Sequence, residues 1–337
     1  MTHCRNLITD VPGLTVGNAR DVRLMSGVTV IIPEHASMAA LDVRGGGPGT
    51  RESDALGLSG SVDAVHAIVL SGGSAFGLSA ATGVQGWLAE RGIGFSVGAA
   101  RVPIVPQAVV FDLLNGGDKN WGISPPYERL ARNACDGASR DFQVGSHGAG
   151  FGATTATLRG GLGSAAEILG GGLVVGALAV VNAVGSATIA ETHHFWAAPF
   201  EKDGEFGGLK SPPHLSADAL QPRLKGTRAG EATTIAVVAT NAKLDKRQAH
   251  RLAVMAQTGL ARALYPVHTP LDGDAVFALA TGEIPLGKDE FAALARLGTY
   301  AANVMARAVA RGVYEASAAP PGWTGPPAYR TRFGSPS

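Results

Sequence analysis

Two adjacent threonines, Thr233 and Thr234, begin a run of β-branched and small apolar residues that continues to Asn241. If the bond between Ala232 and Thr233 breaks, Thr233 gains a free α-amine beside its own hydroxyl. One residue then carries both a nucleophile and the base that activates it. The alternative is that both threonines simply open a strand, where β-branched residues are enriched.

Three further residues carry groups that suit such a nucleophile. Asn182 closes an apolar run, where a buried amide needs partners and where its N–H groups could donate to an oxyanion. Asp272 and Asp274 flank one glycine ahead of another apolar run, so both carboxylates could face one amine or hydroxyl. The plainer interpretations are a satisfied turn at Asn182 and a polar turn at the aspartates.

Two glycine-rich segments, residues 45–50 and 71–74, resemble phosphate-binding loops, and the second leads into a predicted helix. Neither has the lysine of a P-loop or the spacing of a dinucleotide fingerprint, so we predict tight turns whose amides could line a substrate pocket. His193 and His194 would point to opposite faces of a strand and have no acidic partner at useful spacing. We therefore expect no metal and no cofactor.

The composition favours a compact globular protein that acts on a small substrate over a protein that binds polyanions. Of 337 residues, 28 are basic and 27 acidic, which leaves no electrostatic footprint for nucleic acid or anionic lipid. Two cysteines are too few for a disulfide framework, which indicates a reducing compartment. The chain has no apolar signal core and no run that spans a membrane, so we expect a cytoplasmic protein.

Apolar runs and helical periodicity alternate unevenly along the chain, which suits a layered α/β sandwich better than a repeating barrel. Several of the runs are apolar on both faces, as in sheets that are covered on both sides. We predict strands at residues 27–32, 65–70, 104–113, 173–182, 234–240 and 275–280, and helices at residues 74–90, 245–264 and 289–311. The segment 200–232 is polar and proline-bearing and is predicted to be a surface linker, and residues 318–337 an irregular tail.

Motifs spread over nearly the whole chain resemble one known family, the self-processing L-aminopeptidase/D-esterase-amidase family. That family includes β-aminopeptidases and nylon-oligomer hydrolases. Any one of the motifs alone is weak, and together they are specific. They are GLTVGNA at 13–19, DVRGG at 42–46, HAIVLSGGSAFGL at 66–78, GGLGS at 160–164 and VHTPLDGD at 267–274.

The resemblance implies a single αββα domain of the N-terminal-nucleophile type. It implies self-cleavage into an α subunit of residues 1–232 and a β subunit of residues 233–337. By matching positions, Thr233 is the nucleophile, Asn182 the oxyanion-hole asparagine, and Asp272 with Asp274 the acidic pair beside the nucleophile. Relatives form tetramers or larger assemblies, so the resemblance also implies a homo-oligomer.

The chain departs from the family pattern at three places. Ala232 precedes the nucleophile, where relatives often have asparagine or glycine. Phe111 stands where relatives carry a tyrosine near the active site. Thr157 stands where some relatives have a lysine, and Arg159 is the nearest basic residue in the sequence.

The function predicted from these observations is an amidohydrolase or aminopeptidase that cuts amide or ester bonds of small peptides or amino-acid amides through an acyl-enzyme. Two alternatives stay open. An acyltransferase of the ornithine-acetyltransferase type would use the same residues and pass the acyl group to an amine. A non-catalytic binding protein would remain uncut.

Overall fold

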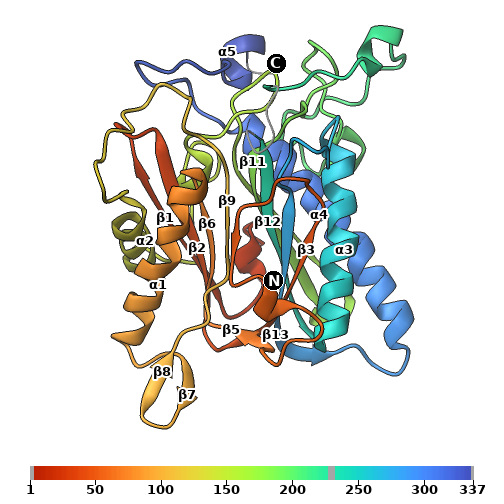
Figure 1. Ribbon diagram of the computed structural model, residues 1–337. Coiled ribbons are helices and arrows are strands. Elements are labelled where there is room, and N and C mark those ends of the chain that lie inside the picture. Colours follow the sequence, from red (N-terminus) through yellow and green to blue (C-terminus); the bar gives the residue numbers. More distant parts are fainter. Residues whose placement is uncertain (1–3, 227–231, 335–337) are drawn as a thin grey trace.

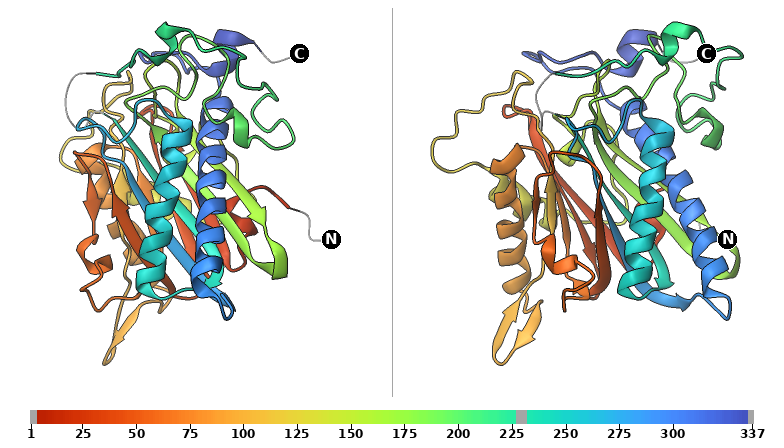
Figure 2. Two further views of the ribbon diagram at one scale, coloured as in Figure 1. Left: turned by 90° about the vertical axis from the view of Figure 1, so that its right-hand side faces the viewer. Right: turned by 45° about the vertical axis from the view of Figure 1, so that its right-hand side comes forward.

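Two β-sheets lie face to face between two layers of helices (Figure 1). The computed structural model describes residues 4–226 and 232–334. One outer layer contains α1 (Ala80–Ala89) and α2 (Tyr127–Asp136), and the other contains α3 (Lys246–Ala263) and α4 (Glu290–Tyr314). Figure 2 shows the stack from two further sides, with α1 on one flank and α3 with α4 on the opposite flank. The predicted αββα sandwich is confirmed.

The first sheet has five strands in the order β1-β2-β6-β9-β4. Its outer face packs against α1 and α2 through a cluster that includes Val28, Val69, Val84 and Leu130. The strands are β1 (Leu14–Asp21), β2 (Ser26–Pro33), β6 (Ile68–Ser71), β9 (Gln107–Val109) and β4 (Thr50–Arg51).

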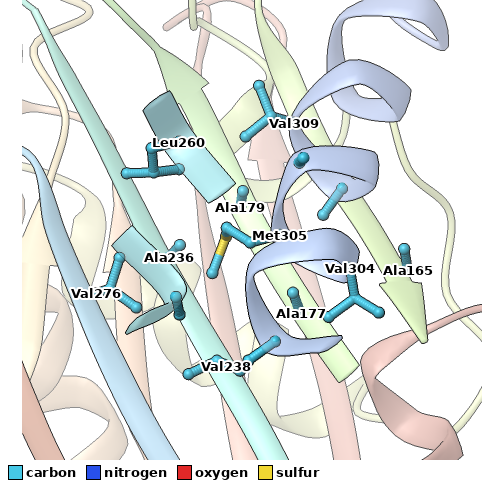
Figure 3. Packing of buried hydrophobic residues seen from close by; sticks show 14 of the residues in the cluster. Ala165, Ala177, Ala179, Ala236, Val238, Leu260, Val276, Val304, Met305 and Val309 are labelled. Atoms are coloured by element: carbon cyan, nitrogen blue, oxygen red, sulfur yellow. The ribbon is translucent and has the colours of Figure 1, made fainter. Parts of the chain in front are cut away.

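The second sheet has six strands in the order β10-β11-β12-β13-β3-β5 and carries the predicted nucleophile. Strands β12 and β13 run parallel, and the other neighbouring pairs are antiparallel. Figure 3 shows how Met305, Val304 and Leu260 from the helix layer pack on small residues of this sheet. The strands are β10 (Gly161–Ile168), β11 (Val174–Asn182), β12 (Thr233–Lys243), β13 (Ala275–Pro285), β3 (Ser37–Val43) and β5 (Ala64–Val65).

Side chains of β12 alternate between two hydrophobic cores. Ile235 and Val237 point into the core between the sheets, whereas Ala236 and Val238 point toward α3 and α4. This double burial explains the unbroken apolar run that predicted the strand. By the same alternation, the side chain of Thr233 points into the space between the sheets.

The predicted helices are present, with one local difference. Asp245 caps α3 as expected. Its side chain accepts from the Gln248 backbone amide, and the Gln248 side chain accepts from the Asp245 backbone amide. The helix predicted from Ser74 starts as a 3₁₀ turn, Ser74–Ser79, and becomes α-helical only at Ala80. Positive φ angles at Gly73 and Ser74 force this tighter entry.

Several remaining elements are short. A hairpin of β7 (Phe95–Val97) and β8 (Ala100–Val102) projects from the end of α1 (Figure 1). The predicted strand at 104–113 is reduced to Gln107–Val109, and 65–70 is divided between β5 and β6. The other 3₁₀ turns are Ile8–Asp10, Asp54–Leu56, Gly148–Gly150, Gly170–Gly172, Ala198–Phe200 and Ala217–Leu220.

The C-terminal tail is more ordered than predicted. It contains a short helix, α5 (Tyr329–Phe333), and the Tyr329 ring is completely buried. Arg159 fixes the start of the tail, because its guanidinium donates to the carbonyls of Ser317 and Ala318 and lies over the ring of Trp323. Within residues 4–226 and 232–334, no helix combines the length and the apolar character needed to cross a bilayer.

Candidate active site

The candidate site lies where β11 ends and β12 begins. Asn182 is the last residue of β11 and Thr233 the first of β12, and the two are direct partners in the antiparallel ladder. Directly opposed residues project to the same face, which here is the space between the sheets. Both side chains are buried. The fold therefore brings together two residues that the sequence separates by about fifty positions.

The Thr233 hydroxyl lies against the peptide bond that is predicted to break. Its Oγ1 donates to the carbonyl oxygen of Ala232 at 2.5 Å. The amide of Gly273 donates to the same carbonyl oxygen at 3.0 Å. The carbonyl oxygen thus accepts from a backbone N–H and from the hydroxyl, so a hydroxyl lies next to a polarised carbonyl.

Only glycine fits at position 273, beside the Thr233 hydroxyl. A Cβ added at position 273 would lie 2.7 Å from Thr233 Oγ1 and 2.6 Å from the carbonyl oxygen of Gly47. The glycine-rich segment 45–47 packs against the same turn. The amides of Gly45 and Gly47 donate to the carbonyls of Asp274 and Asp272. The segment predicted as a tight turn therefore serves to brace the acidic triplet.

We expect Gly273→Ala to prevent or strongly slow breakage at Ala232, because the new methyl group displaces the Thr233 hydroxyl from the carbonyl. The fraction of cut chain on a denaturing gel measures this effect. Gly170→Ala is the matched control, since a Cβ there meets nothing within 4 Å. Normal cutting in Gly273→Ala would show that the hydroxyl acts from another position.

The Asn182 amide is held in one orientation. Its Oδ1 accepts from the amide of Thr154 at 3.0 Å and from the ammonium of Lys225 at 2.9 Å. Its Nδ2 donates to the carbonyl of Phe111 at 3.0 Å. Two donors on the oxygen fix which end of the amide is nitrogen. One N–H therefore remains, among the described residues, to donate to an oxyanion.

The two aspartates flank Thr233 but bond to other groups. Asp272 accepts from the amide of Val184 and from the amide and hydroxyl of Thr269. Asp274 accepts from the amide of Thr234 at 2.7 Å and from the ring Nδ1 of His268 at 2.9 Å. Neither carboxylate accepts from the Thr233 hydroxyl in the uncut chain. They fix the strand ends around Thr233.

Burial, and then repulsion from the neighbouring Asp274, raise the pKa of Asp272 above its ordinary value of 3.8. Between 3.8 and the raised pKa, the folded chain holds a proton that the unfolded chain has released. Folding therefore takes up a proton in that window, and stability decreases as pH rises through it.

From this linkage we expect the parent protein to lose stability relative to Asp272→Asn as pH rises through the raised pKa of Asp272. Denaturant midpoints of both proteins, measured from about pH 4 to pH 7, give the difference. Groups that the two proteins share largely cancel in the comparison. A difference in midpoint that stays constant with pH would mean that burial does not raise the pKa of Asp272.

Two neighbours of the site were not identified from the sequence as functional residues. Lys225 lies in the predicted linker, and its ammonium reaches Asn182. His268 belongs to the VHTPLDGD motif, has a left-handed φ of 56° and bonds Asp274 through both its backbone amide and its ring. The motif gave a signal for His268, whereas the polar composition around Lys225 gave none.

A pocket opens beside the Asn182 amide. Its volume is about 200 Å³, and its lining includes Phe111, Leu114, Thr154, Lys225 and Pro326. Phe111 and Thr154 both contact the Asn182 side chain through their backbones. Asp112 and Asn115 also line the pocket, so it combines apolar residues with polar side chains of both charges.

The other sequence candidates lie outside this arrangement. The amides of Gly72, Gly73 and Ser74 donate to protein acceptors, so the segment 71–74 is a turn and not an anion site. His194 bonds the carbonyl of Lys210. The described residues contain no group of three or more His, Cys, Asp or Glu side chains that would hold a metal ion.

Two of the departures from the family pattern have clear structural outcomes. The Thr157 hydroxyl bonds Ser186 at 2.9 Å. The Arg159 side chain is fully buried against the tail, where burial lowers its pKa to about 10, and it does not bond Asn182 or Thr233. Among the described residues, the cation that bonds Asn182 is Lys225.

Comparison with known proteins finds matches over most of the chain. The model of peptidase family S58 matches residues 6–322. An uncharacterized aminopeptidase of Mycobacterium tuberculosis is 41% identical over 97% of this chain and 98% of its own. A 6-aminohexanoate-oligomer endohydrolase of Kocuria sp. is 31% identical over 82% of this chain and 75% of its own.

Solved structures show the same fold. The L-aminopeptidase D-Ala-esterase/amidase of Ochrobactrum anthropi, described as a variant of the Ntn hydrolase fold, superposes with a TM-score of 0.71 at 20% identity, covering 98% of this chain and 93% of its own. A β-aminopeptidase of Burkholderia sp. gives a TM-score of 0.70 at 21% identity, covering 94% and 89%.

Proposed function

This chain belongs to peptidase family S58, and from that premise we propose that it is a hydrolase that cuts itself before Thr233 and then uses Thr233 as an N-terminal nucleophile. One observation carries the proposal. The Thr233 hydroxyl and the Gly273 amide converge on the carbonyl oxygen of Ala232, at 2.5 Å and 3.0 Å.

Self-cleavage would proceed through an ester. Thr233 Oγ1 attacks the carbonyl carbon of Ala232, and the Gly273 N–H stabilises the charge that develops on the carbonyl oxygen. The C–N bond breaks, the hydroxyl proton passes to the nitrogen, and Ala232 is left esterified to Oγ1. Water then hydrolyses the ester, which leaves a carboxylate on Ala232 and a free α-amine on Thr233.

Hydrolysis of a substrate would use the freed residue. The α-amine of Thr233 accepts the hydroxyl proton, and Oγ1 attacks an amide or ester carbonyl. The second N–H of Asn182 Nδ2 donates to the oxyanion. The amine of the substrate departs with a proton, and water releases the acyl group. Asp272 and Asp274 would lie beside the new cationic amine and offset its charge.

We propose a small peptide or amino-acid amide as substrate and a homo-oligomer of cut chains as the working assembly. Two relatives carry the names aminopeptidase and 6-aminohexanoate-oligomer endohydrolase, and both names denote hydrolysis of amide bonds. The pocket of about 200 Å³ beside Asn182 suits a small acyl group.

Denaturing mass analysis of the purified protein, combined with hydrolysis of amino-acid p-nitroanilides and 6-aminohexanoate oligomers, tests the proposal. We expect two chains that correspond to residues 1–232 and 233–337. An uncut chain that still hydrolyses amides would contradict the mechanism, and an uncut, inactive chain would favour a binding protein. Transfer of the acyl group to an added amine in preference to water would identify an acyltransferase.

A further inference from the structure

The ammonium of Lys225 is surrounded by oxygens of the candidate site. It donates to the carbonyl oxygen and Oγ1 of Thr154 at 2.9 and 3.1 Å, and to the carbonyl oxygen and Oδ1 of Asn182 at 3.0 and 2.9 Å. An ammonium has three hydrogens, and each of these four oxygens lies within hydrogen-bond distance of it. The side chain is half-buried, which reduces the screening of its charge by water.

The backbone of Lys225 is fixed as well. Its amide donates to the carbonyl of Val184 at 2.8 Å, and the amide of Val184 in turn donates to Asp272 at 3.1 Å. The linker is therefore attached, shortly before Ala232, to the strand end that carries Asn182. The attachment lies on the α side of the proposed cut and does not depend on the broken bond.

We propose that Lys225 is a positioning residue, which orients and polarises the Asn182 amide so that Nδ2 faces the oxyanion. The proposal deepens the function described above and rests on it. A cation on Oδ1 excludes the flipped amide, because the flipped NH₂ group would meet the ammonium and the Thr154 N–H. It also draws electron density from the amide, which makes the remaining Nδ2 hydrogen a stronger donor.

Neither Thr157 nor Arg159, the two positions considered from the sequence, places a positive charge on Asn182 in place of Lys225. Thr157 bonds Ser186, and the Arg159 guanidinium bonds carbonyls of Phe151, Ser317 and Ala318. A segment that composition alone predicts to be a surface linker thus supplies a charge to the site.

The test uses the mature enzyme and the best substrate from the p-nitroanilide and oligomer panel. We expect Lys225→Met to lower kcat by about tenfold, a part of the loss for removing an oxyanion donor, and to leave KM within about twofold. Lys225→Arg, which keeps the charge, should recover part of the rate. Lys210→Met is the matched control, an exposed lysine of the same linker, and should behave as the parent.

A double-mutant cycle distinguishes positioning from a general effect on the fold. If Lys225 acts through Asn182, Lys225→Met should cost less than about twofold in an Asn182→Ala background. A full additional tenfold loss there, or parental kcat in the single variant, would overturn the proposal. Should Lys225→Met fail to fold, Lys225→Gln replaces it in both arms.

Different experimental results would contradict the role of Lys225 and the proposed function. Activity that survives in a Thr233 variant lacking the hydroxyl would remove the proposed function, whatever Lys225 does. Parental activity in Lys225→Met, with Thr233 shown to be essential, would remove only the role of Lys225.

Discussion

We expect Thr233→Val to abolish both self-cleavage and hydrolysis, by a factor of the order of 10⁶ for the chemical step, because the variant keeps the shape of threonine and loses the proposed nucleophile. Denaturing mass analysis should find one chain of 34.2 kDa. Thr233→Ser keeps a hydroxyl at the same atom and should retain part of both activities. The hydroxyl is buried and bonded to the Ala232 carbonyl.

Thr234→Val is the internal control for this experiment. The Thr234 hydroxyl is buried on the opposite face of β12 and has no hydrogen-bond partner among the described residues. Removing an unsatisfied buried hydroxyl costs little stability. We expect normal maturation. An inactive Thr234→Val beside a maturing Thr233→Val would place the nucleophile one residue further along.

Asn182→Ala in the mature enzyme should lower kcat by about 10² to 10³, the loss measured elsewhere when a side-chain oxyanion donor is removed. Steady-state kinetics with the best panel substrate give the value. The structure supports a specific donor because Oδ1 is engaged by Thr154 and Lys225, which leaves Nδ2 as the end with a hydrogen to offer.

Asn241→Ala is a matched control for Asn182→Ala. Asn241 is also a buried asparagine on this sheet, at the other end of β12, and its amide bonds the backbone of Val174 and Gly172. Its loss should reduce the denaturant midpoint without a comparable loss of kcat. Turnover of Asn182→Ala within a few-fold of the parent would mean that backbone amides suffice for the oxyanion.

The central strands and main helices could be predicted because their residues report burial directly. The run at β12 is apolar on both faces, and α3 is capped by Asp245 and Gln248. Strand β10 gave no such signal because most of its residues are small. A Cβ at Gly163 would lie 1.8 Å from the carbonyl oxygen of Ala308, so the glycine is set by the close approach of α4. Such tertiary demands are not visible in local periodicity.

The site divides in the same way. Thr233, Asn182 and the aspartates could be proposed from the sequence because reactive groups and family motifs coincide there at strand ends. The contribution of Gly273 depends on a contact with Thr233 across a turn, and that of Lys225 on the path of a polar linker. Neither follows from spacing, since each results from where two distant segments meet.

The order of strands in the second sheet determines how the two proposed pieces are held. Strands β12 and β13 lie between β11 and β3, so the later piece of the chain is inserted into a sheet built by the earlier one. Helix α4 also covers β10 and β11. The pieces are therefore interlocked, and they could part only by dismantling the core. Before the cut, folding is a reaction of one molecule. After the cut, refolding would require two separate chains to associate. The stability of the mature protein would then be set by its rate of unfolding rather than by a reversible folding equilibrium.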